Sequence, residues 1–204
     1  MKYIVDNLIP EDDCKIILDG ILSQEDKFKI TDEFGIIELS VYECSFYDLN
    51  DDKVKKMLNY YIHKLSKKLG VNYGTDKSII IYKDDKIMMK PHYDGGTSTT
   101  IIYLNNDFEG GGTGFPLLER IHKPQDHKPG HFLHYSSTNL FAYHAGMPVT
   151  KGIKVAVVLK TTKWFPFYIF TAIPWAIFVN LLFEPLVISK LLKERIDDFI
   201  FNNK

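Results

Sequence analysis

Two histidines and one aspartate form a pattern that could bind a metal ion. His92 and Asp94 are two residues apart, and His144 follows fifty residues after Asp94. In an extended strand, the side chains of residues i and i+2 point to the same face, so His92 and Asp94 would lie together. Two imidazoles and one carboxylate can occupy one face of an octahedral ion and leave three positions open. This ligand set suits Fe(II), and the open positions would admit a co-substrate and O2.

A lysine near the second histidine adds to this pattern. Lys154 begins the apolar run Val155–Val158, ten residues after His144. A buried ammonium without a partner is costly, so a lysine inside a barrel would be useful if it met a carboxylate. Alternatively, Lys154 is the exposed first residue of a strand.

The elements that must position these residues are two helices followed by strands. Acidic residues suit the first turn of a helix, and Glu11–Asp13 precede helical apolar spacing over Cys14–Leu22. A second helix is expected over Asp52–Leu69, ended by Gly70. This order predicts an α+β fold whose strands form a sandwich or barrel. Short strands rich in β-branched and aromatic residues are predicted at 78–82, 99–104, 131–135, 139–143 and 154–161.

Length and composition limit the class of protein. The 204 residues have a formal net charge of -1, which excludes a nucleic-acid binder that relies on a broad basic surface. Cys14 and Cys44 are the two cysteines, and neither belongs to a CxxC pair. This argues against a disulfide scaffold or a cysteine-ligated zinc.

Five short motifs follow one another between residues 90 and 154. They are KPHYD (90–94), TTIIYLN (99–105), GGGTGFP (110–116), PGHFLHY (129–135) and YHAGMPVTKGIK (143–154). In order and spacing they resemble the catalytic domain of 2-oxoglutarate- and Fe(II)-dependent dioxygenases, in the prolyl 4-hydroxylase-like branch. The resemblance extends from about Met1 to Thr162. It implies a double-stranded β-helix, a distorted jelly roll, supported by N-terminal helices.

The resemblance implies a role for each residue of the site. His92, Asp94 and His144 would ligate Fe(II), and Lys154 would pair with the distal carboxylate of 2-oxoglutarate. Tyr103 matches a tyrosine that hydrogen-bonds the same carboxylate in relatives.

The implied activity is hydroxylation of a protein side chain, with peptidyl-proline 4-hydroxylation as the expected reaction. Fe(II), 2-oxoglutarate and O2 would be required, with ascorbate as a candidate reductant, and 2-oxoglutarate would be converted to succinate and CO2. The partner would be a proline-containing protein or peptide. The lysine at position 154 is typical of the collagen-type branch. An intact Asp94 favours hydroxylation over halogenation, because halogenating relatives replace this carboxylate by a small residue.

Two further residues are candidates for the co-substrate site. Thr99 precedes Tyr103 by four residues and would face the same side of its strand. Tyr82 resembles the tyrosine of a Tyr-x-x-Gly motif, but it stands ten rather than nine residues before the first histidine, and the glycine is replaced by Lys83–Lys86. Met89 stands where relatives often carry a second aromatic residue. These departures concern the peptide groove and leave the metal pattern unchanged.

Four other histidines form a loose cluster in the sequence. His122, His127, His131 and His134 are spaced by five, four and three residues. They could make a second metal site, but two prolines interrupt the segment and no cysteine is near. We interpret His131 and His134 as residues that flank a strand.

The apolar residues concentrate after Lys163. Trp164–Phe183 is a run of 20 residues without a charged side chain, and a helix of about this length can cross a bilayer core of about 30 Å. Two internal prolines would kink such a helix. A kinked span, a re-entrant hairpin and an interfacial helix all fit, and a soluble helix packed on the domain is the alternative.

We therefore expect two unlike parts. Residues 1–163 would form the dioxygenase domain, and 164–204 an apolar helical tail that contacts a membrane through 164–188 and ends in a short amphipathic helix. The first residues do not resemble a signal peptide. This predicts a membrane-associated protein whose catalytic domain faces the cytosol, with a soluble cytoplasmic protein as the alternative.

Two other hypotheses remain open at this point. The same chemistry could act on a small molecule, a lipid or a side chain other than proline. A catalytically idle jelly-roll module tethered to a membrane is also compatible with the sequence. The complete set of His92, Asp94, His144 and Lys154 argues against an idle module.

Overall fold

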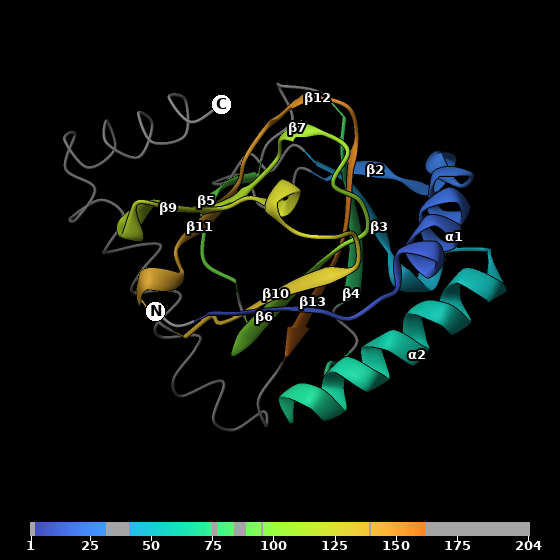
Figure 1. Ribbon diagram of the computed structural model, residues 1–204, viewed down its shortest axis with the longest axis horizontal. Helices are drawn as coiled ribbons and strands as arrows, with labels where there is room; N and C mark the ends of the chain where they lie inside the picture. The colour runs from blue at the N-terminus through green and yellow to red at the C-terminus, as the bar shows by residue number, and fades with distance from the viewer. Residues whose placement is uncertain are drawn as a thin grey trace.

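The structure, a computed structural model, describes residues 3–31, 41–74, 77–83, 89–94, 96–138 and 140–161. In these ranges the chain forms antiparallel β-sheets with two α-helices on one side (Figure 1). The predicted tail at 164–204 lies outside the described residues. None of the helices in these ranges has the length and apolar character needed to cross a membrane.

Two sheets contain most of the strands. The larger has the order β1-β10-β6-β13-β4-β3-β2, the smaller has the order β5-β11-β8-β9, and β12 pairs separately with β7. The bounds in the larger sheet are β1 (Tyr3–Asn7), β10 (His131–Ser136), β6 (Ser98–Tyr103), β13 (Lys154–Thr161), β4 (Lys77–Tyr82), β3 (Val41–Ser45) and β2 (Lys29–Thr31). The others are β5 (Met89–His92), β11 (His144–Gly146), β8 (Thr113–Phe115), β9 (Arg120–His122), β12 (Val149–Lys151) and β7 (Glu109–Gly110).

Helix α1 has a start signal, and helix α2 has both a start and a stop signal. Helix α1 (Glu11–Leu22) carries three acidic residues in its first turn, as the helix dipole favours. Helix α2 (Asp52–Leu69) is capped by Asp51, whose carboxylate accepts hydrogen bonds from the backbone N–H groups of Lys53 and Val54. Gly70 ends α2 in the left-handed conformation, with φ of 64°. Helix α1 therefore begins at the acidic residues, and α2 ends at the glycine, that the sequence analysis identified.

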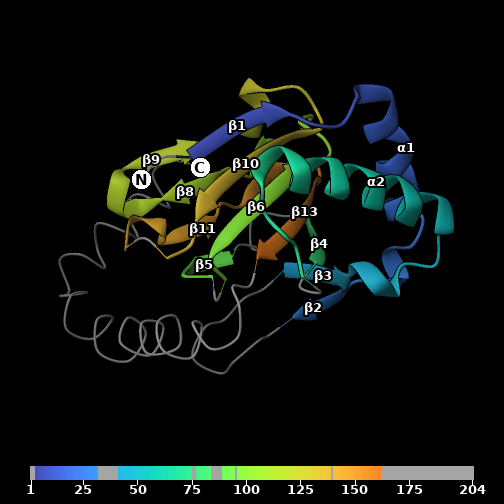
Figure 2. The ribbon, with the colours of Figure 1, turned by 90° about the horizontal axis from the view of Figure 1, so that it is seen from below.

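The helices cover one face of the larger sheet (Figure 2). Val155, Val157 and Leu159 of β13 belong to the core cluster that α1 and α2 complete. Ala156 and Val158 alternate with them and pack in clusters on the opposite face, toward the smaller sheet. Because both faces of β13 are buried, its sequence is a continuous apolar run rather than an alternating one. The face opposite the helices carries the candidate site.

Most predicted elements are confirmed, within a residue or two at their ends. The α+β class is also confirmed, and the two sheets are consistent with a jelly-roll core. The strand predicted at 139–143 is wrong, since Leu140–Ala142 forms a 3-10 helix, η5, and the strand β11 begins only at His144. The aromatic and apolar residues of this segment favoured a strand, but the backbone forms a helical turn over Leu140–Ala142 instead. The remaining 3-10 helices are η1 (Glu25–Lys27), η2 (Phe46–Asp48), η3 (Pro116–Leu118) and η4 (Pro124–Asp126).

Candidate metal centre

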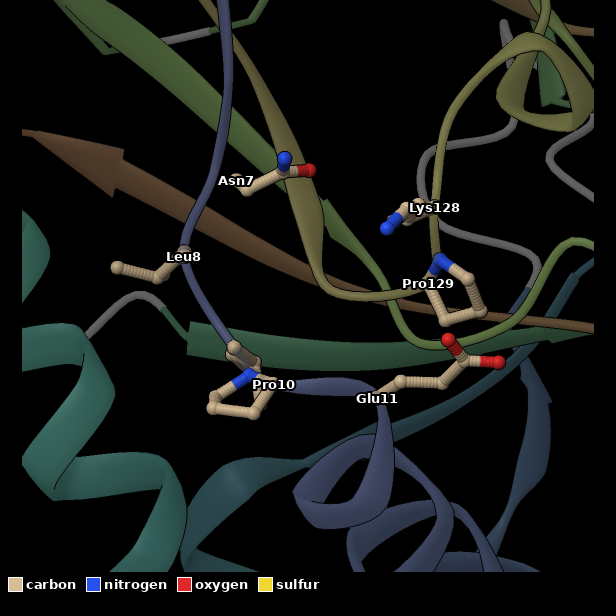
Figure 3. A pocket seen from close by; sticks show the side chains of 7 residues that line it. Asn7, Leu8, Pro10, Glu11, Lys128 and Pro129 are labelled. Atoms are coloured by element: carbon tan, nitrogen blue, oxygen red, sulfur yellow. The ribbon is translucent and has the colours of Figure 1, made fainter.

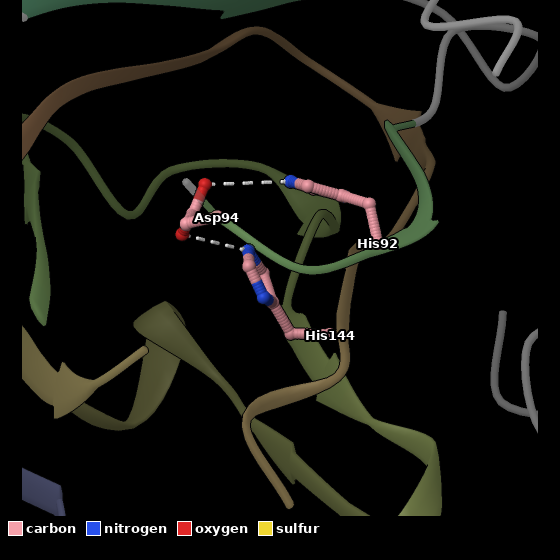
Figure 4. A group of neighbouring side chains, drawn as sticks. All are labelled: His92, Asp94 and His144. Carbon is pink, nitrogen blue, oxygen red and sulfur yellow. Dashed lines mark ion pairs between the residues drawn. The ribbon is translucent and has the colours of Figure 1, made fainter. Parts of the chain in front are cut away.

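His92, Asp94 and His144 converge as the sequence predicts. His92 ends β5, His144 begins β11, and the two residues are partners across this antiparallel pair. Asp94 follows β5, and its two carboxylate oxygens lie 3.6 Å from His92 Nε2 and 3.5 Å from His144 Nε2 (Figure 4). One ligand atom from each residue falls within 4.8 Å of the others. In the part of the chain that the structure describes, this is the one group of three or more histidine, cysteine or acidic side chains with ligand atoms so close.

The Asp94 carboxylate is fixed by neighbours from the larger sheet. Its side chain is only 3% exposed. The Thr99 hydroxyl donates to Asp94 Oδ2 at 2.5 Å, and the Tyr135 hydroxyl donates to the same oxygen at 3.3 Å. Lys160 Nζ lies 3.4 Å from Asp94 Oδ1. The carboxylate is therefore held in one orientation by groups that do not belong to the metal pattern.

The electrostatics favour an ionised carboxylate beside neutral imidazole. Burial alone would raise the pKa of Asp94, but the charges and hydrogen bonding of His144, His92 and Lys160 outweigh it and hold the pKa well below its usual value. Burial lowers the pKa of His144 to about 4, although the Asp94 charge opposes this shift. A carboxylate and a neutral imidazole are the protonation states that bind a metal ion.

The ring of His144 is also oriented for metal binding. Its Nδ1–H donates to the backbone carbonyl of Ala142 at 2.9 Å, within the turn that precedes β11. Because Nδ1 carries the proton, Nε2 presents its lone pair toward Asp94. A backbone carbonyl that fixes the second ring nitrogen is a common support of metal-binding histidines.

Lys154 is buried rather than exposed at the start of β13. Lys154 is 2% exposed. Its ammonium nitrogen lies over the ring of Tyr82, 4.2 Å from the ring centroid, and it lies 5.5 Å from the ring centroid of Tyr103. Among the described residues no acidic side chain forms an ion pair with Lys154. Burial lowers the pKa of Lys154 to about 7. The alternative that Lys154 is the exposed first residue of a strand is therefore wrong. A buried lysine without an acidic partner among the described residues is suited to bind an anion.

The two candidate tyrosines both contact Lys154. The Tyr103 hydroxyl shares a 2.6 Å hydrogen bond with Thr113 Oγ1 from β8, and its ring stacks on His131 at 4.8 Å. The Tyr82 hydroxyl lies against Gly146, where a Cβ atom would collide with it. Burial raises the pKa of both tyrosines, so both hydroxyls stay protonated. Tyr82 thus lies beside the lysine even though its spacing from His92 departs from the family motif.

Thr99 contacts a different part of the site from the one the sequence suggested. It faces the same side of β6 as Tyr103, but its hydroxyl donates to Asp94 and shares a hydrogen bond with Ser137 Oγ at 2.8 Å. Its contact in the structure is therefore with the candidate metal ligand, and its predicted contact with the co-substrate stays a prediction.

Three residues of the site escaped the sequence analysis. Lys160 and Tyr135 contact Asp94, and Thr113 contacts Tyr103. Strand alternation could have identified Lys160, because it lies six residues after Lys154 and so faces the same side of β13. The contacts of Tyr135 and Thr113 depend on strand pairing, which no local pattern reveals.

The histidine cluster is only partly assembled. The rings of His122, His127 and His131 lie 4.8 to 5.3 Å apart, whereas His134 instead bonds Thr100. His131 Nδ1–H donates to the carbonyl of Lys128, and its Nε2 lies 3.1 Å from His122 Nε2. Burial lowers the pKa of His122 to about 3 and of His131 to about 4, so this hydrogen bond joins neutral rings. The strand predicted at 131–135 is confirmed as β10, but His134 lies within it rather than beside it.

A pocket of about 340 Å³ lies away from these residues. It is formed by the end of β1, the start of α1 and the turn Lys128–Pro129 (Figure 3). None of the seven residues that line it belongs to the predicted site.

Comparisons with known proteins identify the fold. No protein-family model matches the sequence, and no curated protein matches it. Solved structures do match. A viral collagen prolyl hydroxylase of Paramecium bursaria Chlorella virus 1, in its 2-oxoglutarate complex, gives a TM-score of 0.59 at 19% identity, over 78% of this chain and 95% of that one.

Two further structures are similar. A prolyl hydroxylase from Trichoplax adhaerens, in complex with a peptide fragment of hypoxia inducible factor, gives a TM-score of 0.61 at 16% identity, over 78% of this chain and 83% of that one. A Pseudomonas putida prolyl-4-hydroxylase gives a TM-score of 0.55 at 11% identity, over 79% and 92%. The chain therefore has the prolyl 4-hydroxylase-like fold of the 2-oxoglutarate-dependent oxygenases.

Proposed function

We propose that the chain is an Fe(II)- and 2-oxoglutarate-dependent dioxygenase that hydroxylates a peptide side chain, with proline as the target. The observation that carries this proposal is the convergence of His92, Asp94 and His144 in one ligand group. The fold adds support, because its structural neighbours are prolyl hydroxylases, one of them solved with 2-oxoglutarate and another with a peptide.

The residues present fit Fe(II). Two imidazoles and an ionised carboxylate form a ligand set that leaves half of an octahedral coordination shell open. No cysteine takes part, since Cys14 and Cys44 are buried elsewhere in the core. Thr99 and Ala142 orient two of the three ligands through hydrogen bonds.

The residues present also fit 2-oxoglutarate. Lys154 is a buried ammonium without an acidic partner in the described part of the chain, and a carboxylate would compensate its charge. Tyr103 adds a protonated hydroxyl beside it. A dicarboxylate that reached both Lys154 and the ligand group would satisfy the two charged parts of the site together.

The chemistry of hydroxylation comes from the cofactors. When bound, Fe(II), 2-oxoglutarate and O2 supply an oxidant that inserts one oxygen atom into a C–H bond, while 2-oxoglutarate is converted to succinate and CO2. His92, Asp94 and His144 would hold the metal, and Lys154 with Tyr103 would orient the co-substrate. The buried aromatic rings of Tyr82, Tyr103 and Tyr135 would exclude water from the reacting centre.

Succinate release tests this function. Purified protein supplied with Fe(II), 2-oxoglutarate, ascorbate and O2 should release succinate, and the His92→Ala variant should not. Mass spectrometry of proline-containing peptides should show the gain of one oxygen atom. If the wild-type protein neither binds 2-oxoglutarate nor converts it, the proposed function is wrong. If 2-oxoglutarate is converted and no peptide gains oxygen, the same chemistry acts on another class of substrate.

The division of the chain is proposed on the sequence alone. Residues 1–163 would form the catalytic domain, and 164–204 would attach it to a membrane through the uncharged run Trp164–Phe183. The test is partition between vesicles and buffer for the full chain and for a variant in which four residues of this run are replaced by aspartate. If residues 164–183 attach the protein to a membrane, the wild-type protein should sediment with vesicles and the aspartate variant should not. Equal partition of the two proteins would contradict membrane attachment.

A further inference from the structure

Strand β13 carries two lysines to the same side of the sheet. Residues on its helix side are Val155, Val157 and Leu159, so Lys154 and Lys160 both face the candidate site. Six residues of strand separate their Cα atoms by about 20 Å. Lys154 lies at the co-substrate end of the site, and Lys160 lies beside the metal ligands.

Lys160 occupies the solvent side of the ligand group. Its side chain is 29% exposed, whereas those of Asp94, His144 and His92 are 3%, 6% and 10% exposed. Its ammonium lies 3.4 Å from Asp94 Oδ1. A substrate that approaches the ligand group from solvent therefore meets this positive charge.

The contact with Asp94 does not by itself account for a lysine at this position. Asp94 Oδ2 already accepts hydrogen bonds from Thr99 and Tyr135, two side chains that are 1% exposed. These rigid donors from β6 and β10 orient the carboxylate. A flexible four-carbon stem that ends in a compact ammonium is suited to follow a ligand.

We infer that Lys160 is a specificity-determining residue that receives an anionic group of the primary substrate, and that this substrate is an acidic peptide. This inference rests on the proposed function and adds the class of peptide. An Asp or Glu carboxylate next to the hydroxylated residue would form a charge-assisted hydrogen bond with Lys160.

The test uses three synthetic peptide pools and three forms of the full-length protein. The pools share a central proline and differ only in whether the flanking residues are Glu, Gln or Lys. The proteins are wild type, K160R, which keeps the charge, and K160M, which keeps the length. Peptide-dependent succinate release is measured for each pair. Comparing pools within one protein cancels any general loss of activity that the substitution causes through Asp94.

The expected result is a kcat/KM about tenfold higher for the Glu pool than for the Gln pool with wild type and K160R. The ratio should fall to about one in K160M. The wild-type preference should also shrink as salt is raised, because screening weakens a partly exposed charge pair.

Two results would overturn the inference. One is an equal rate for the Glu and Gln pools with wild type, or a Glu preference that K160M retains. The other is that no pool stimulates succinate release while the protein still binds 2-oxoglutarate and converts it in the absence of peptide. A protein that does neither with 2-oxoglutarate would instead contradict the proposed function itself.

Discussion

His144 lies directly opposite His92 in the β5–β11 pair, and the centroids of their imidazole rings are 4.4 Å apart. Two proposed metal ligands that are distant in the sequence thus become neighbours through the register of one short strand pair. A slip of one residue would turn His144 to the other face of its sheet, away from Asp94. The proposed metal site therefore depends on the features that fix this register.

Gly146 is one such feature, and its substitution should be destabilising. In Gly146→Ala the new Cβ would meet the Tyr82 hydroxyl and lie 3.1 Å from both Tyr82 Cζ and Met89 Cβ. We expect a loss of about 1–3 kcal/mol in the free energy of unfolding, measured with urea. Tyr82→Phe removes the hydroxyl, so the double variant should lose less than the sum of the single ones. Strict additivity would contradict the contact.

Thr99 should support metal binding through Asp94. Thr99→Val removes the hydroxyl that donates to Asp94 Oδ2 and keeps the shape of the side chain. We expect the affinity for Mn(II), used as a redox-stable substitute for Fe(II), to fall about 10- to 100-fold. Thr97→Val is the matched control, because the Thr97 side chain bonds Thr161 rather than a ligand. Equal weakening in both variants would show a general effect on the fold.

Lys154 should affect binding and stability in opposite directions. Lys154→Met removes a buried charge that has no acidic partner in the described residues, so the free energy of unfolding of the protein without 2-oxoglutarate should rise by about 1 kcal/mol. The Kd for 2-oxoglutarate, measured by calorimetry with Mn(II), should rise at least about tenfold. Lys151→Met, at an exposed ion pair with Glu109, should change neither quantity appreciably. If Lys154→Met left the Kd unchanged, the lysine would not contact the co-substrate.

The buried histidine pair should make the protein sensitive to acid. The pKa values of His122 and His131 are lowered by burial to about 3 and about 4, below the usual 6.5. Between the lowered pKa values of the folded protein and pH 6.5, the unfolded chain binds more protons than the folded one. The contribution of the two neutral histidines to the free energy of unfolding is therefore complete above about pH 6.5 and is lost as the pH falls toward 4. Each of the two histidines should contribute about 1.4 kcal/mol per pH unit to this loss. His131→Gln should reduce this slope in urea titrations, whereas His63→Gln, at an exposed helical position, should not.

The sequence was most informative where the signal is local. The apolar spacing over Asp52–Leu69 and the glycine that follows it predicted α2 at its observed bounds. The spacing of His92 and Asp94 predicted that their side chains share a face. The side chains do lie together, although β5 ends at His92 and Asp94 already lies outside the strand. The local spacing in the sequence therefore identified His92 and Asp94 as two neighbouring residues of the site.

The rest of the site depends on contacts between distant segments. Tyr135 reaches Asp94 because β10 pairs with β6, and Thr113 reaches Tyr103 because β8 lies in the facing sheet. A strand was predicted at 139–143 because aromatic residues are frequent in strands, but Leu140–Ala142 forms a 3-10 helix. No pattern in one sequence distinguishes these outcomes, because tertiary packing decides them.

His92, Asp94 and His144 are proposed to hold a metal ion at which 2-oxoglutarate is converted to succinate. The most direct measurement is succinate formation by the purified full-length protein with Fe(II), 2-oxoglutarate and O2. It should be compared with single alanine variants of the three residues and with His63→Ala as the control. Succinate is expected from wild type and from His63→Ala, and none above background from an alanine variant of His92, Asp94 or His144. Succinate formation that survives the loss of His144 or Asp94, or that is absent from the folded wild-type protein, would contradict it.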